Sequence, residues 1–168
     1  MKRLPFSAAW VIAFGVLAGS SVADGEKQHR HGRIDASKAL DKAFGRAFDP
    51  RKAQRTIRIE MSDTMRFTPS ELEVRQNDTV RFVVRNAGRQ MHELVLGTLE
   101  ELRRHADQMG KHPGMQHDEA WMTHVAPGKT GELGWQFTRP GTYFYGCLVP
   151  GHFEAGMIGK VVVVPALP

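Results

Sequence analysis

Hydrophobic and polar residues alternate in short runs from Arg55 onward. In residues 56–61, every second residue, beginning with Ile57 and Ile59, is apolar. Residues 71–75, 79–85, 133–137 and 142–147 alternate in the same way, and strand-like apolar runs occupy residues 91–96, 121–125 and 158–164. Because side chains point to alternate faces of a strand, this period predicts strands with one face in a core. About seven or eight short strands separated by turns predict an all-β fold, a Greek-key β-sandwich.

Two segments have the spacing of a helix instead. Thr98, followed three residues later by Glu101, is the signature of a capping box, so residues 98–109 are predicted to form a helical insertion in the β fold. The apolar residues of segment 35–48 also recur at helical spacing. We predict a short amphipathic helix there, ending before Asp49 and Pro50.

The N-terminus has the features of an export signal. Lys2 and Arg3 give a short basic start, residues 8–18 are apolar, and residues 21–23 form a small-x-small cleavage motif. We predict cleavage after Ala23 and a periplasmic location. The apolar run is too short to span a bilayer comfortably, so we expect no membrane span in the mature chain. Residues 24–54 are then a polar, flexible leader with the short helix, and residues 55–168 form one domain.

Charge and motifs exclude several classes of function. The formal net charge is +5, but the basic residues are scattered among acids rather than clustered with aromatic residues. This distribution predicts no nucleic-acid partner. The sequence also contains no Ser-His-Asp motif, phosphate-binding loop or dinucleotide fingerprint, so we expect no enzyme activity.

The strongest chemical signal lies between the last two predicted strands. Cys147 is the single cysteine of the chain, and His152 and Met157 follow it at equal intervals. A buried cysteine acting as a small hydrophobic residue is one interpretation. The alternative interpretation is that a metal ion binds the thiolate, because an unprotected thiol would be oxidised in an oxidising compartment. Thiolate, imidazole and thioether together suit copper.

A trigonal copper site of the blue type needs a second imidazole. His92 fits best, because it follows a turn, begins a predicted strand and is followed by apolar residues. The other candidates lie in the predicted insertion or just after it: His105, His112, His117 and His124. Of these, we interpret His124 as structural.

Three segments resemble the cupredoxin family: residues 91–96, residues 126–133, and residues 140–164 with the loop from Cys147 to Met157. The similarity covers about residues 55–165 and is greatest to exported, azurin- and plastocyanin-like copper proteins linked to bacterial copper tolerance. It implies one type 1 copper ion, with His92, Cys147 and His152 as equatorial ligands and Met157 as the axial ligand.

Glu93 departs from the family pattern. Many cupredoxins have an asparagine directly after the first ligand histidine, and its hydrogen bonds tie the ligand loops together. The sequence has a glutamate at this position. Whether an equivalent link exists is therefore open at the level of sequence.

The predicted insertion contains additional donors for copper. His105, Met109 and His112 are spaced to share one helix face, and Met115 and His117 follow them. Imidazole and thioether together suit Cu(I), so these five residues are a candidate second, labile copper site. The alternative is an exposed helix and loop without metal.

Together these features predict an exported type 1 copper protein for copper tolerance or handling, with one-electron exchange between Cu(I) and Cu(II). A dedicated electron-transfer shuttle to a reductase or oxidase is the first alternative. The apolar residues around His152 would form a small docking surface for a redox protein, which favours this alternative. A metal-free β-sandwich interaction module is the second alternative. We expect a monomer.

Overall fold

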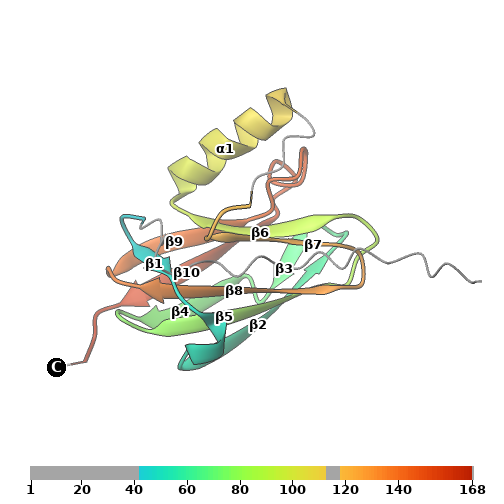
Figure 1. Ribbon diagram of the computed structural model, residues 1–168. Helices are drawn as coiled ribbons and strands as arrows, with labels where there is room; N and C mark the ends of the chain where they lie inside the picture. Colours follow the sequence, from blue (N-terminus) through green and yellow to red (C-terminus); the bar gives the residue numbers. More distant parts are fainter. Residues whose placement is uncertain (1–41, 113–117, 168) are drawn as a thin grey trace, which may run out of the picture. The chain divides into compact units, whose positions relative to one another are not determined.

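The computed structural model describes residues 42–112 and 118–167, in which ten strands form two five-stranded sheets (Figure 1). The predicted signal peptide, residues 1–23, and the leader as far as residue 41 lie outside these residues. Within the described part of the chain, no helix has the length and apolar character needed to cross a membrane.

The first sheet has the strand order β1-β8-β5-β2-β3. Its strands are β1 (Gly45–Ala47), β2 (Arg55–Ser62), β3 (Arg66–Thr68), β5 (Thr79–Asn86) and β8 (Thr130–Phe137). The pair β2 and β5 is parallel, and the other pairs are antiparallel. Along β2, buried Ile57, Ile59 and Met61 alternate with more exposed residues, as the two-residue period predicts.

The second sheet has the order β4-β10-β9-β6-β7. Its strands are β4 (Glu71–Arg75), β6 (His92–Gly97), β7 (Met122–Val125), β9 (Gly141–Gly146) and β10 (Ile158–Val164). Here β4 and β10 are parallel, so both sheets are mixed. Both sheets contribute to one main core, whose largest fully buried side chains include Trp135, Tyr145, Phe82 and Phe137. The predicted β-sandwich is confirmed.

The predicted helix over residues 35–48 is wrong in its described part, because Gly45–Ala47 is strand β1, antiparallel to β8. Phe44 is buried and its ring stacks on that of Tyr143 at a centroid distance of 4.5 Å. A Cβ atom at Gly45 would collide with the carbonyl oxygen of Gln136, so only glycine allows this close approach. The side of β8 that faces away from β5 pairs with β1, and it supplies the backbone hydrogen bonds that residues 45–47 would otherwise form within a helix. The short 3₁₀ helix η2 (Pro50–Lys52) then leads into β2.

The predicted insertion is helix α1 (Leu99–Lys111), between β6 and β7. Its capping box is formed: Thr98 Oγ1 accepts from the Glu101 N–H, and the Glu101 carboxylate accepts from the Thr98 N–H. The helix contacts β6 and β9 and lies over the second sheet in Figure 1. A second core forms beneath it from Val95, Leu102, Ala106, Met109, Met122 and Leu148.

Candidate metal centre

His92 is the first residue of β6 and is fully buried. Side chains two apart on a strand share a face, so His92 lies on the same side as Leu94 and Leu96, which belong to the main core. The opposite face of β6 contributes Val95 to the second core. His92 is therefore held at one end of a strand that is packed on both sides.

The loop of residues 147–157 joins β9 to β10 and is closed at its base. The Cys147 N–H donates to the Met157 carbonyl at 3.1 Å, directly beyond the last strand pair. Inside the loop, the Met157 N–H donates to the His152 carbonyl at 3.0 Å, and the His152 N–H donates to the Val149 carbonyl at 2.9 Å. These bonds fix the backbones of Cys147, His152 and Met157 relative to one another.

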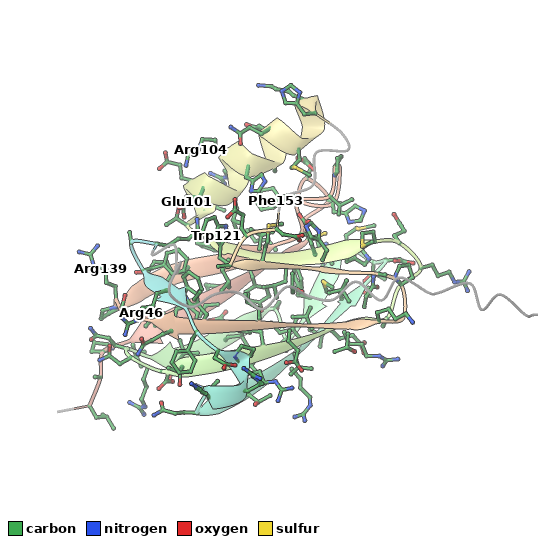
Figure 2. The ribbon with its side chains drawn as sticks, in the orientation of Figure 1. Arg46, Glu101, Arg104, Trp121, Arg139 and Phe153 are labelled. Carbon is green, nitrogen blue, oxygen red and sulfur yellow. The ribbon has the colours of Figure 1, made fainter. Side chains whose placement is uncertain are left out.

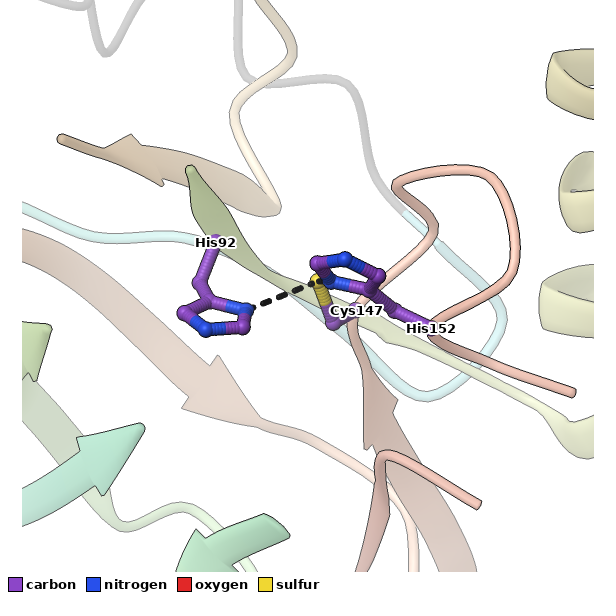
Figure 3. Close-up of side chains that lie close together, drawn as sticks. All are labelled: His92, Cys147 and His152. Atoms are coloured by element: carbon purple, nitrogen blue, oxygen red, sulfur yellow. Dashed lines mark hydrogen bonds between the residues drawn. The ribbon is translucent and has the colours of Figure 1, made fainter. Parts of the chain in front are cut away.

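His92, Cys147 and His152 come together in the structure (Figure 3). Cys147 Sγ lies 3.3 Å from His152 Nδ1 and 3.8 Å from His92 Nδ1. First-row metal bonds to a thiolate and an imidazole are about 2.3 and about 2.0 Å long, which at a trigonal angle separates the donor atoms by about 3.7 Å. The donor spacing therefore fits a metal ion. Among the described residues, His92, Cys147 and His152 form the cluster of three or more His, Cys, Asp or Glu side chains whose donor atoms lie close enough together to hold a metal ion.

The protonation states also suit a soft metal ion. Burial raises the pKa of the Cys147 thiol to about 12, so the thiol keeps its proton at neutral pH until a metal cation displaces it. Burial lowers the pKa of His152, and the neighbouring His92 lowers it further, which favours the neutral imidazole that a metal requires. One sulfur and two imidazole nitrogens are donors that suit copper.

Asp63, in the turn between β2 and β3, contacts the far side of the His92 ring. Its Oδ1 lies 3.1 Å from His92 Nε2. The backbone N–H of Arg89 holds the pKa of the Asp63 carboxyl below its usual value, so the group is an ionised acceptor. His92 Nε2 must then carry the proton, which leaves the Nδ1 lone pair on the Cys147 side. Sequence reasoning missed Asp63, because a polar residue in a Ser-Asp-Thr turn carries no sign of this contact.

Glu93 makes the connection that the sequence left open. It is buried, and its Oε1 accepts from the Leu148 N–H at 3.0 Å, while its own N–H donates to Cys147 Sγ at 3.5 Å. The other carboxylate oxygen lies 2.9 Å from His124 Nδ1. A glutamate therefore ties β6 to the cysteine loop here, and His124 supports that glutamate instead of joining the metal cluster.

The other predicted ligands lie in different environments. Met157 is buried next to Cys147 and His152 through the backbone bonds of the loop. Met109 packs in the second core, His105 lines a cavity beside α1, and His112 is exposed at the end of α1. Met115 and His117 lie outside the described residues. The structure gives Met109 a packing role, and a second copper site stays a prediction.

The apolar surface predicted around His152 is smaller than the sequence suggests. Leu148 is buried in the second core, and Phe153 packs against that core beneath α1 (Figure 2). Pro150 is exposed and Val149 partly so, while His152 keeps 7% of its surface accessible. Ala155 is also exposed, so the apolar surface of the loop consists mainly of Pro150 and Ala155, with partly exposed Val149 and Phe153.

Comparisons with known proteins agree with the site. The family model for copper binding proteins, the plastocyanin/azurin family, matches residues 53–164. The copper-resistant cuproprotein CopI of Rubrivivax gelatinosus is 49% identical to this chain over an aligned length of 147 residues, and the match covers 86% of this chain and 89% of that protein. The copper-resistant cuproprotein CopI of Pseudomonas aeruginosa is 32% identical, with 98% of each protein covered.

A solved structure shows the same fold. It is auracyanin A from Chloroflexus aurantiacus, described as a "blue" copper protein, with a TM-score of 0.56 and 28% sequence identity. The similarity covers 64% of this chain and 97% of auracyanin A. The family match spans well over half of the chain and includes all three clustered donor residues. The chain therefore belongs to the plastocyanin/azurin family of copper-binding proteins, the cupredoxins, and its cofactor is copper.

Proposed function

We propose that this protein is an exported copper-resistance protein that holds one type 1 copper ion with His92, Cys147, His152 and Met157. The observation that carries the proposal is the buried cluster of one thiol sulfur and two imidazole nitrogens, at 3.3 and 3.8 Å from that sulfur. The names of the two relatives, both copper-resistant cuproproteins, support the role in resistance. The signal-like residues 1–23 support export.

Copper in such a site supplies one-electron exchange between Cu(I) and Cu(II). The chain supplies donor atoms whose positions are fixed before the ion arrives. The hydrogen bond from the Cys147 N–H to the Met157 carbonyl closes the loop. The hydrogen bond from the Leu148 N–H to the Glu93 carboxylate anchors the loop to β6. Preorganised donors need little rearrangement when the charge of the ion changes.

The protein around the donors controls access to them. His92, Cys147 and Met157 are fully buried, while His152 reaches the surface. Electrons exchanged with another molecule therefore have their shortest path through His152. In this proposal the protein acts as a monomer and has no catalytic turnover.

The test begins with the metal-free protein and Cu(II). The wild-type protein should develop a strong visible band from charge transfer between Cys147 and copper. Cys147→Ser should lose the band and keep the far-ultraviolet circular dichroism of a β fold, and His112→Ala, at an exposed position, should keep both. A loaded wild-type protein without the band would refute the proposed site.

The role in resistance needs a separate measurement in cells. Cells that lack the protein should grow poorly in excess copper, and the wild-type gene should restore growth while the Cys147→Ser gene should not. Equal growth of all three strains would remove copper resistance from the proposal and leave only the metal site.

Electron transfer to a reductase or oxidase is the second candidate function. The partial exposure of His152 beside exposed Pro150 favours it, because weak redox encounters use small interfaces. In that case, loss of the protein should slow respiration at ordinary copper concentrations and leave copper tolerance unchanged. Because the chain belongs to a copper-binding family, we no longer consider the alternative of a metal-free interaction module.

A further inference from the structure

Asp63 lies on the side of the His92 ring that faces away from Cys147. Its Oδ1 is 3.1 Å from His92 Nε2, whereas His92 Nδ1 is the atom near the sulfur. Two backbone N–H groups also donate to the carboxylate, Arg89 at 2.8 Å and Gln90 at 3.3 Å. The carboxylate therefore joins the turn after β2 to the segment that leads into β6.

The turn opposite Asp63 is shaped to receive this carboxylate. A Cβ atom at Gly88 would overlap the Asp63 side chain, so the space exists because residue 88 has none. The buried Asn86 side chain fixes the turn: it accepts from the Gly88 N–H at 2.8 Å and donates to the carbonyls of Gln90 and Val125 at 2.7 and 2.8 Å. The Asp63 carboxylate is therefore held in one position beside the His92 ring by the surrounding turn, and its contact with the ring is a built feature of the fold.

We propose that Asp63 is a positioning residue that holds His92 as the tautomer protonated at Nε2 and favours Cu(II) over Cu(I) in the site. The inference rests on the proposed type 1 site. A carboxylate that accepts from a ligand imidazole fixes its tautomer and raises its basicity. Cu(II) carries one more positive charge than Cu(I), so it gains more from a basic ligand and from a nearby negative charge. Asp63 therefore lowers the reduction potential.

Asp63→Asn tests the effect of the charge with little change in shape. Outer partners of metal ligands typically change affinity by about 10- to 100-fold, and the lower end applies because the Asp63 side chain is 33% exposed. We expect the ratio of Cu(II) to Cu(I) affinity to fall about tenfold, which raises a one-electron potential by about 59 mV. Spectroelectrochemical titration of the visible band measures this shift.

Two further variants separate the charge from general damage. Gly88→Ala displaces the carboxylate without removing it and should also raise the potential. Asp78→Asn is the matched control, because Asp78 also accepts from a backbone N–H, that of Arg75 at 2.9 Å. Asp78 precedes β5 and Asp63 follows β2, and these strands are parallel, so the two residues lie at opposite ends of the sheet. Asp78→Asn should leave the potential unchanged.

The metal-free protein provides a readout that does not depend on copper. Nitrogen-15 chemical shifts should show wild-type His92 as the Nε2-protonated tautomer and show a mixture of tautomers in Asp63→Asn. If Asp63→Asn and Gly88→Ala keep the visible band and the wild-type potential, the inference about Asp63 is wrong while the proposed copper site stands. A wild-type protein without the band would overturn both.

Discussion

Replacing Glu93 with alanine should destabilise the metal-free protein by about 3 kcal/mol. Glu93 is 2% exposed and accepts from the Leu148 N–H at 3.0 Å, with His124 Nδ1 at 2.9 Å from its other oxygen. Without the carboxylate the buried Leu148 N–H has no acceptor, which costs about 1–3 kcal/mol. The His124 side chain is 25% exposed and can regain water, so we add nothing for that contact and take the upper end of this range.

Urea unfolding followed by tryptophan fluorescence measures this loss, since Trp135 is fully buried. Glu132→Ala is the matched control: Glu132 pairs with Arg81 on a strand, but the side chains are 39% and 37% exposed, and such pairs contribute about 0–1 kcal/mol. Glu93→Gln keeps an oxygen for the Leu148 N–H and should fall between the two. If Glu93→Ala loses no more stability than Glu132→Ala, the carboxylate does not tie β6 to the loop.

Three further results are expected. Because burial raises the pKa of Cys147 to about 12, each copper ion must displace a thiol proton. Copper affinity, measured by competition with a chelator, should therefore rise about tenfold per pH unit between about pH 7 and 9. An affinity that does not change with pH would contradict this reasoning. Gly45→Ala should lower the free energy of unfolding by about 1–3 kcal/mol and change the fluorescence of Trp135, because the new methyl group collides with β8; unchanged unfolding would contradict that packing. If the insertion binds metal, copper stoichiometry under reducing conditions should exceed one ion per chain and fall to one when His112 and His117 are replaced, whereas one ion in both proteins would remove the second site.

Local patterns predict most of the strands, because most of the strands have one face against the core; β6, buried along its whole length, is the exception. In β2 and β10 the buried residues alternate strictly with more exposed ones. Strand β1 could not be predicted in this way: Phe44 and Ala47 are three residues apart, which also suits a helix. What decides their structure is β8, whose Gln136 is 90 residues from its partner Arg46. A local pattern does not contain that partner.

The same distinction applies to the metal centre. Cys147, His152 and Met157 lie on one loop, so their spacing alone suggests a site, and the turn before His92 suggests the second imidazole. The supporting residues depend on how distant segments align. Asp63 is 29 residues from His92, and Glu93 is 55 residues from Leu148. Such contacts follow from the pairing of β6 with β9 and from the turn after β2, neither of which is visible in the sequence around these carboxylates.

The second core beneath α1 has a consequence for how quickly copper is released. Leu148 directly follows Cys147 and is buried among Leu102, Ala106 and Met109 of the helix. A loop movement that exposes the sulfur must withdraw Leu148 from this core, and exposing a leucine costs about 1.5–3 kcal/mol. The residence time of the ion is therefore coupled to the packing of a helix that supplies none of the clustered donors. Faster transfer of copper from Leu102→Ala than from wild type to a chelator would show this coupling, and equal rates would disprove it.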